Sequence, residues 1–113
     1  MRILITGGFG YLGGRISQFI ASKTECEILL GSRYKSELPG WIPQGEVVQT
    51  YWESSVSLEQ VVKGVDIIVH SAGMNAQDCA ADPVAALAIN GLATARLLEA
   101  AKRQGVKRII YLS

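Results

Sequence analysis

The residues best suited to chemistry in this sequence are glycines near its amino terminus. Gly8, Gly10 and Gly13 follow the apolar run Arg2–Thr6 and open a helical pattern over Tyr11–Lys23. This spacing permits a tight turn, a close approach of backbone amides to a pyrophosphate, and close packing of helix on strand. The amino terminus of the helix would face the phosphates with a partial positive charge. The pattern favours phosphate binding, and a glycine-rich loop without a ligand is the alternative.

A second candidate site follows the apolar run at residues 27–30, where the sequence reads Gly31, Ser32 and Arg33. In a dinucleotide-binding domain an acid at this place binds the adenosine ribose of NAD, whereas a nearby arginine accommodates the extra phosphate of NADP. Gly31 stands where NAD-preferring domains carry the acid. Arg33 can pair with a phosphate through its planar guanidinium, so we predict NADP in preference to NAD. A solvated surface arginine is the alternative.

A third candidate site lies beyond the apolar run at residues 66–70, which ends in His70. Ser71, Ala72 and Gly73 follow that run, and ligands of parallel sheets bind beside the carboxyl ends of such strands. We therefore expect the backbone of these three residues to border the cofactor. We interpret His70 as a structural residue and not a catalytic one, although its ordinary pKa would suit proton transfer.

Charge and cysteine content exclude several other functions. The 11 basic and 10 acidic residues are scattered along the chain, so no basic stripe predicts nucleic-acid binding. Cys26 and Cys79 lie far apart without a Cys-x-x-Cys spacing, which predicts ordinary reduced thiols and no metal site. No uninterrupted apolar stretch approaches the roughly 18 residues of a membrane span, and no secretion signal is evident. We expect a cytoplasmic protein.

The elements that must position these residues alternate between strand and helix. Apolar runs predict strands, and apolar residues that recur at spacings of three and four residues predict helices. Strands separated by helices imply right-handed crossovers and one Rossmann-type α/β domain over residues 1–113: a doubly wound parallel sheet of order 3-2-1-4-5 in three α/β/α layers. We predict strands at residues 2–6, 27–30, 47–51, 66–70 and 108–112, helices at 11–23, 58–63 and 82–103, and a loop at 34–45.

The sequence also resembles a known family. Residues 6–13, Thr-Gly-Gly-Phe-Gly-Tyr-Leu-Gly, are similar to the Thr-Gly-x-x-Gly-x-x-Gly signature of extended short-chain dehydrogenases/reductases, the nucleotide-sugar epimerase/dehydratase group. Residues 66–73 resemble the fourth strand of that family with its His-x-Ala-Ala/Gly end. Residues 82–108 resemble the helix and strand that follow, so the resemblance covers essentially the whole chain.

The resemblance implies roles for individual residues. Tyr51 and Trp52 occupy the place where the family usually carries an aspartate that contacts adenine, so these aromatic side chains would contact the base or else pack against the loop. Asn90 falls near the nicotinamide end of the site, where it would support catalysis or simply be a polar residue of the helix. The implied cofactor-binding residues are Gly7, Gly10, Tyr11, Leu12, Gly13, Ser32, Arg33, Tyr51, Trp52, Ser71, Ala72 and Gly73.

The resemblance further implies chemistry by a serine or threonine, a Tyr-x-x-x-Lys pair and the nicotinamide ring. No Tyr-x-x-x-Lys occurs in the chain, and Ser113 corresponds to the residue just before the serine or threonine. The leading hypothesis is the NAD(P)-binding part of an oxidoreductase, epimerase or dehydratase of a nucleotide-linked sugar, inactive as these 113 residues alone. The alternatives are a non-catalytic NADP-binding sensor or interaction module and an NADPH-dependent reductase of a small carbonyl compound. The helix at residues 82–103 implies a homodimer.

Overall fold

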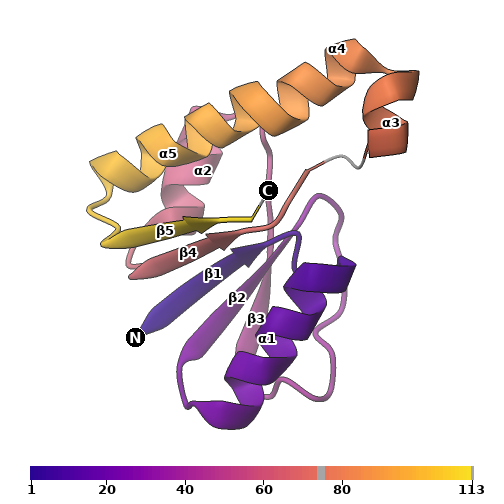
Figure 1. Ribbon diagram of the computed structural model, residues 1–113. Coiled ribbons are helices and arrows are strands. Elements are labelled where there is room, and N and C mark those ends of the chain that lie inside the picture. Colours follow the sequence, from indigo (N-terminus) through magenta and orange to yellow (C-terminus); the bar gives the residue numbers. More distant parts are fainter. Residues whose placement is uncertain (74–75, 113) are drawn as a thin grey trace.

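The protein folds around one parallel sheet, whose strands fan out side by side in Figure 1. The computed structural model describes residues 1–73 and 76–112, so Ser113 lies outside the described residues. The strand order is β3-β2-β1-β4-β5 and all pairs are parallel, which confirms the predicted Rossmann-type topology. The strands are β1 (Arg2–Thr6), β2 (Glu27–Ser32), β3 (Gly45–Gln49), β4 (Ile67–His70) and β5 (Arg108–Tyr111).

Helices cover the sheet from two sides because the strands are apolar on both faces. Figure 1 shows α1 against one face and α2 with α5 against the other. Leu4 of β1 belongs to the core under α2 and α5, whereas its neighbours Ile3 and Ile5 belong to the core under α1. The helices are α1 (Tyr11–Lys23), α2 (Ser55–Val62), α3 (Ala76–Ala81), α4 (Pro83–Ala86), the π-helical segment η1 (Leu87–Leu92) and α5 (Ala93–Arg103).

The bounds of β2 and β3 correct the prediction from sequence. Gly31 was expected to end the second strand, but β2 continues to Ser32 because β3 pairs with it there: Gly31 lies opposite Val48 and Ser32 opposite Gln49. The third strand was expected at residues 47–51 and lies at Gly45–Gln49. The predicted bounds were wrong because pairing with β3 lengthens β2. The apolar periodicity of one segment contains no information about the strand that will pair with it.

The second helix also begins earlier than the prediction of residues 58–63. Ser54 caps it, because the Ser54 hydroxyl accepts a hydrogen bond of 3.1 Å from the backbone N–H of Ser57. The cap at the start of α4 agrees with the prediction: a carboxylate oxygen of Asp82 accepts a 3.1 Å bond from the backbone N–H of Ala85, and Pro83 occupies the first helical turn.

The long predicted helix is continuous from Pro83 to Arg103 but contains the π-helical segment η1, and a short helix, α3, precedes it. Pro83–Arg103 is 21 residues long and contains an 18-residue window with a mean hydropathy of 1.3, so it is long and apolar enough to cross a membrane by length and composition alone. That criterion is weak evidence here, because Leu97, Ala100 and Ala101 of this helix pack into the core beneath α2. Polar and charged residues also interrupt the stretch.

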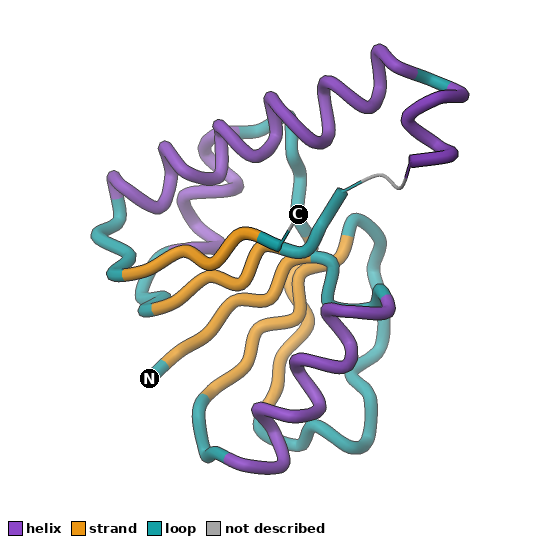
Figure 2. The backbone as a smooth tube through the Cα atoms, in the orientation of Figure 1, coloured by secondary structure: helices purple, strands orange, loops and turns teal. Residues whose placement is uncertain are grey.

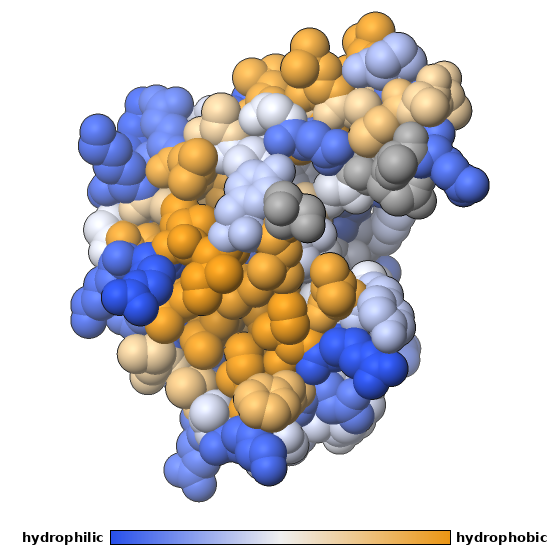
Figure 3. All heavy atoms as spheres, viewed as in Figure 1, coloured by the Kyte–Doolittle hydropathy of each residue, from blue (hydrophilic) through white to orange (hydrophobic). Residues whose placement is uncertain are grey.

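Large apolar side chains remain exposed on several elements, among them Phe19 of α1 and Ile110 of β5. Figure 3 shows a broad hydrophobic area over the sheet face that α1 only partly covers. Further hydrophobic atoms follow the long helix at the top of the same view. We call the large exposed side chains of that helix its outer apolar residues: Val84, Leu87, Leu92 and Leu98.

Candidate functional site

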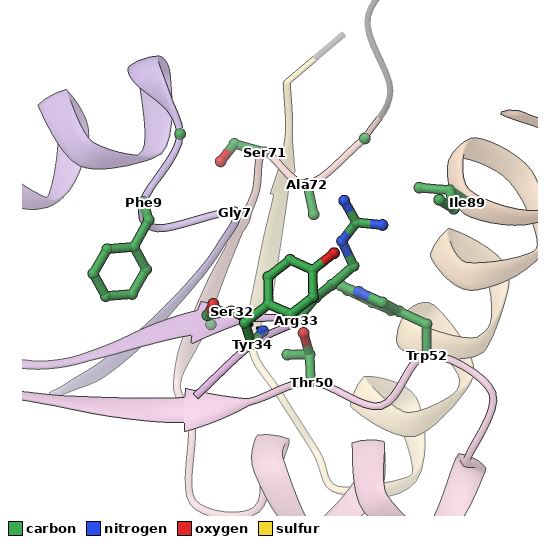
Figure 4. Close-up of a pocket in the computed structure, with 13 residues that line it drawn as sticks. Gly7, Phe9, Ser32, Arg33, Tyr34, Thr50, Trp52, Ser71, Ala72 and Ile89 are labelled. Atoms are coloured by element: carbon green, nitrogen blue, oxygen red, sulfur yellow. Dashed lines mark hydrogen bonds between the residues drawn. The ribbon is translucent and has the colours of Figure 1, made fainter. Parts of the chain in front are cut away.

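The carboxyl ends of β1, β2, β3 and β4 lie at one edge of the sheet (Figure 2). A cavity of about 270 Å³ opens at that edge, and Figure 4 shows the residues that line it. Eight of the predicted cofactor-binding residues line it: Gly7, Gly10, Ser32, Arg33, Trp52, Ser71, Ala72 and Gly73. Gly31, named in the second candidate site for its missing acid, also lines the cavity, and the remaining lining residues were not predicted: Phe9, Tyr34, Thr50 and Ile89. Tyr11, Leu12, Gly13, Tyr51 and Asn90 lie outside this lining.

The glycine-rich turn joins β1 to α1 through a conformation that side chains would obstruct. Gly7 has a φ of +63°, and a Cβ atom there would come within 2.9 Å of the backbone nitrogen of Ala72. The N–H of Gly10 donates a 2.9 Å hydrogen bond to the carbonyl oxygen of Gly7. A Cβ atom on Gly13 would collide with that carbonyl oxygen and with the Ser71 hydroxyl. The glycines therefore hold the start of α1 against the end of β4.

The amino terminus of α1 is suited to an anion. Gly10 is its N-cap and provides no side-chain cap, and the first turn contains no acidic residue. The first amides of a helix lack partners within the helix, and the helix dipole adds partial positive charge there. Tyr11 and Leu12 begin the helix with exposed side chains, so their predicted contribution to binding would come from backbone amides.

The segment after β2 directs Arg33 toward the cavity. The Ser32 hydroxyl accepts a 3.2 Å bond from the backbone N–H of Tyr34, and the Gln49 side chain donates a 3.1 Å bond to the Arg33 carbonyl. The Arg33 guanidinium lies 5.7 Å from the centre of the Tyr34 ring, and Figure 4 shows it pointing into the cavity. Arg33 is the one charged residue among the described residues that line the cavity.

Tyr51 and Trp52 face different environments although they are neighbours. Trp52 is buried, belongs to the core under α5 and still lines the cavity. A side-chain nitrogen of Arg96 donates a 3.1 Å bond to the Trp52 carbonyl, which ties this loop to α5. Tyr51 is about half exposed, at 51%. The alternative for these aromatics was packing against the loop; Trp52 instead packs into the core under α5, and Tyr51 is exposed.

His70 is buried at the end of β4, with hydrogen bonds at both ring nitrogens. Nδ1 lies 2.6 Å from the Thr6 hydroxyl, and Nε2 lies 2.9 Å from the Thr94 hydroxyl on α5. The ring meets Tyr111 edge-on, with 5.5 Å between centroids, and lies tilted against Trp52. Loss of hydration on burial lowers the pKa of His70 below its ordinary value of 6.5. These contacts agree with the structural interpretation of this residue.

Asn90 lies in η1, half-buried beside the edge of the cavity. Its side-chain amide donates a 3.3 Å hydrogen bond to the sulfur of Cys79, and its Oδ1 lies next to Gly73. Its neighbour Ile89 lines the cavity. Cys79 and Cys26 are half-buried and are not joined in a disulfide. Within residues 1–73 and 76–112, no group of three histidine, cysteine or acidic residues is placed to hold a metal ion.

Local sequence signals account for some of the missed lining residues. Phe9 lies inside the glycine-rich motif, and Tyr34 adjoins Arg33, so both were within reach of a motif-based prediction. Ile89 comes from a helix far along the chain, and no local pattern relates it to the turn. Thr50 follows β3, whose end was placed two residues too late.

Comparisons with known proteins agree with this geometry. The curated uronate dehydrogenase of Pseudomonas putida is 30% identical over 112 residues, which are 99% of this chain and 40% of that protein. The crystal structure of uronate dehydrogenase from Agrobacterium tumefaciens is 29% identical with a TM-score of 0.82, over 99% of this chain and 40% of that one. A mutant of that enzyme in complex with NAD is 28% identical with a TM-score of 0.79, over the same shares.

The chain therefore spans about 40% of the length of these relatives. A model of the NAD dependent epimerase/dehydratase family matches residues 3–113, nearly the whole chain. Together with the sheet order and the glycine-rich turn, this match confirms the resemblance noted in the sequence: the chain belongs to the NAD dependent epimerase/dehydratase family.

Proposed function

We propose that this chain is the NAD(P)-binding part of an oxidoreductase, epimerase or dehydratase that acts on a nucleotide-linked sugar by reversible hydride transfer. One observation carries the proposal: the glycine-rich turn, the N-cap residue Gly10 of α1 and the segment that follows β4 border a single cavity. The backbone amides at the start of α1 would bind the pyrophosphate, and Ser71, Ala72 and Gly73 would border the rest of the dinucleotide. The bound nicotinamide would supply hydride transfer at a sugar carbon.

A free sugar acid is a second candidate substrate. The relatives reported above are named uronate dehydrogenases, and that name indicates dehydrogenation of a uronate. Both candidate substrates would react at the same dinucleotide site. They differ in whether the sugar is linked to a nucleotide. The family's Tyr-x-x-x-Lys pair is not among these 113 residues, so we propose that residues outside them complete the chemistry and that Asn90 supports it.

We propose NADP as the preferred cofactor. Ser32, which closes β2, carries no charge, and the cavity lining contains Arg33 and no carboxylate among the described residues. A 2′-phosphate would therefore meet a guanidinium and no like charge. The complex of a relative with NAD favours the opposite preference, which makes cofactor choice a necessary measurement. At the adenine, we propose edge contact with Trp52 and surface contact with Tyr51.

We also propose a homodimer that forms through the long helix, in the cytoplasm. The outer apolar residues of the long helix leave a hydrophobic surface that a second copy would cover. Gly91 and Ala95 lie exposed between them and would permit close approach of two helices.

Calorimetric titration of the 113-residue chain with NADP and NAD tests the cofactor site. We expect binding of both, tighter for NADP, and loss of binding in Gly13→Val, whose side chain would collide with the Gly7 carbonyl. Gly40→Ala is the control, because a Cβ atom there meets nothing within 4 Å. Absence of dinucleotide binding in the folded wild-type chain would contradict the proposal.

Enzyme assays test the substrate class. The 113-residue chain should show no turnover with NADP and either a nucleotide sugar or a free uronic acid. The polypeptide made from the complete reading frame should act on one of the two, and that result decides between them. Cofactor binding without turnover of any sugar by that polypeptide would favour the sensor or interaction module.

A further inference from the structure

The hydrogen bonds around His70 fix where its proton lies. The Thr6 hydroxyl accepts bonds from the backbone N–H groups of Ser71, at 3.1 Å, and Ala72, at 3.2 Å. A hydroxyl has two lone pairs and one hydrogen, so both lone pairs are used and the hydrogen must point to His70 Nδ1, 2.6 Å away. Nδ1 is then an acceptor. The neutral ring carries its hydrogen on Nε2 and donates it to the Thr94 hydroxyl, 2.9 Å away.

These bonds form one directed series through the interior. It runs from the amides of Ser71 and Ala72 to Thr6, then to His70, then to Thr94 on α5. Ser71 and Ala72 line the cavity, and Thr94 is four residues beyond Asn90 in the same continuous helix. The imidazole therefore connects two residues of the cavity lining, Ser71 and Ala72, to the long helix that also contributes Ile89 to the lining. The centre of the series is nearly inaccessible to water: Thr6 is fully buried, His70 is 2% exposed and Thr94 is 8% exposed. Water therefore cannot replace a lost partner of the imidazole.

We propose that His70 is a positioning residue, which in its neutral Nε2–H form holds the Ser71–Ala72 backbone in the geometry that binds the dinucleotide. The inference rests on the proposed cofactor site and adds to it a residue that does not touch the ligand. His70 acts through Thr6, whose hydroxyl is correctly oriented only while Nδ1 accepts its hydrogen.

Protonation of the ring would break the series at one point. A charged imidazole donates from both nitrogens, so Nδ1–H would face the Thr6 hydroxyl, whose lone pairs already serve Ser71 and Ala72. Around the ring, β1 contributes Thr6, α5 Thr94, the loop after β3 Trp52 and β5 Tyr111, and Tyr111 is the one titratable group among these described contacts. No carboxylate appears among them to compensate the charge. Cofactor affinity should therefore fall as the pH decreases.

Nuclear magnetic resonance tests the proton position without any variant. His70 is the only histidine in the sequence, so its ¹⁵N signals are unambiguous. We expect a neutral ring with hydrogen on Nε2 at about pH 7.5. A ring with hydrogen on Nδ1, or a charged ring at that pH, would overturn the proposal.

Two pairs of variants separate positioning from general stability. In His70→Asn the shorter side chain places its amide oxygen at the Thr6 end, whereas in His70→Gln the longer side chain carries its amide to the Thr94 end. We expect His70→Asn to keep NAD affinity within about threefold and His70→Gln to weaken it about tenfold. Thr6→Ser should keep the affinity for NAD, and Thr6→Val should weaken it about tenfold, as His70→Gln does. Val62→Ala, in the core under α5, is the control for lost packing alone.

The readouts are NAD affinity between about pH 5 and 7.5 and amide hydrogen exchange at Ser71 and Ala72 without cofactor. NAD avoids the 2′-phosphate, which itself titrates near about pH 6. His70→Gln and Thr6→Val should speed exchange at both amides, and His70→Asn should abolish the wild-type pH dependence. Equal effects of the two His70 variants, or unchanged exchange, would overturn the proposal. If the wild type binds no dinucleotide, the proposed function fails, and the exchange data still decide the role of His70.

Discussion

Gly73 and Asn90 touch at the edge of the cavity: a Cβ atom on Gly73 would come within 2.9 Å of the Asn90 Oδ1. Gly73→Ala should therefore displace the Asn90 side chain from its present position. If Asn90 lies at the nicotinamide end, calorimetry should show that the variant binds NAD about tenfold more weakly, a loss of about 1.4 kcal/mol in binding free energy. Its affinity for ADP, which has no nicotinamide, should be unchanged. Gly40→Ala is the matched control, because its Cβ atom enters open space. Equal losses for NAD and ADP would place this contact on the adenosine side.

Gly7 and Gly10 should respond differently to substitution. Gly7 has a positive φ and its Cβ atom would press on Ala72, so Gly7→Ala should lower the free energy of unfolding by about 1–3 kcal/mol. Gly10 has a φ of −77°, and a Cβ atom there would meet only the Gly7 carbonyl oxygen, at 3.3 Å. Gly10→Val should therefore leave a folded protein that no longer binds dinucleotide. Thermal unfolding and calorimetry measure the two effects, and retained binding in Gly10→Val would show that the pyrophosphate lies elsewhere.

Arg33→Ala should remove the preference for NADP. The guanidinium points into the cavity and is the charged group that a 2′-phosphate would meet there. We expect NADP affinity to fall at least tenfold, about 1.4 kcal/mol, with NAD affinity nearly constant. Lys35→Ala, two residues along the same loop and outside the described lining, is the control. An unchanged ratio of the two affinities would remove Arg33 from cofactor selection.

The stability of the fold should depend on pH through His70. Burial lowers its folded-state pKa below the ordinary value of 6.5, so the unfolded chain binds the proton more tightly. The contribution to stability is therefore complete above the ordinary pKa of 6.5 and is lost as the pH falls from there through the folded-state pKa. Urea unfolding of the wild type and His70→Asn over this range measures the difference. A wild type that becomes relatively more stable at acid pH would contradict the lowered pKa.

Substitution on the long helix should separate the proposed homodimer. Leu87 is 75% exposed and Val84 79% exposed, so lysine at either position would bury a charge in the interface at high cost. Sedimentation should show a dimer for the wild type and a monomer for Leu87→Lys, with little change in folding. Phe19→Lys on α1 is the control, since Phe19 is exposed on another face. A wild-type monomer at high concentration would exclude the dimer.

Elements whose signals are local were predicted closely from the sequence. The predicted helix at residues 11–23 agrees with α1 at both ends, because the glycine-rich turn and its apolar spacing lie within one segment. The extension of β2 through Gly31 was missed because it depends on β3. Ser54 is a serine of the type that caps helices, but the second helix was predicted from its apolar spacing, which begins only at Leu58, and the cap was missed. Contacts of the site that join distant segments, such as Thr6 with His70 and Gly73 with Asn90, depend on the assembled sheet and have no sequence signal of their own.

The π-helical segment Leu87–Leu92 makes the long helix longer by one residue than a regular α-helix of the same rise. Each residue turns an α-helix by about 100°, from roughly 3.6 residues per turn. The wide i→i+5 turn takes up this extra residue, so the helix stays aligned on both sides of it. The same extra residue in a regular α-helix would rotate the residues before it by about 100° relative to Leu97 in the core. The π-helical turn thus keeps the cavity edge and the outer apolar residues aligned with the packing of α5.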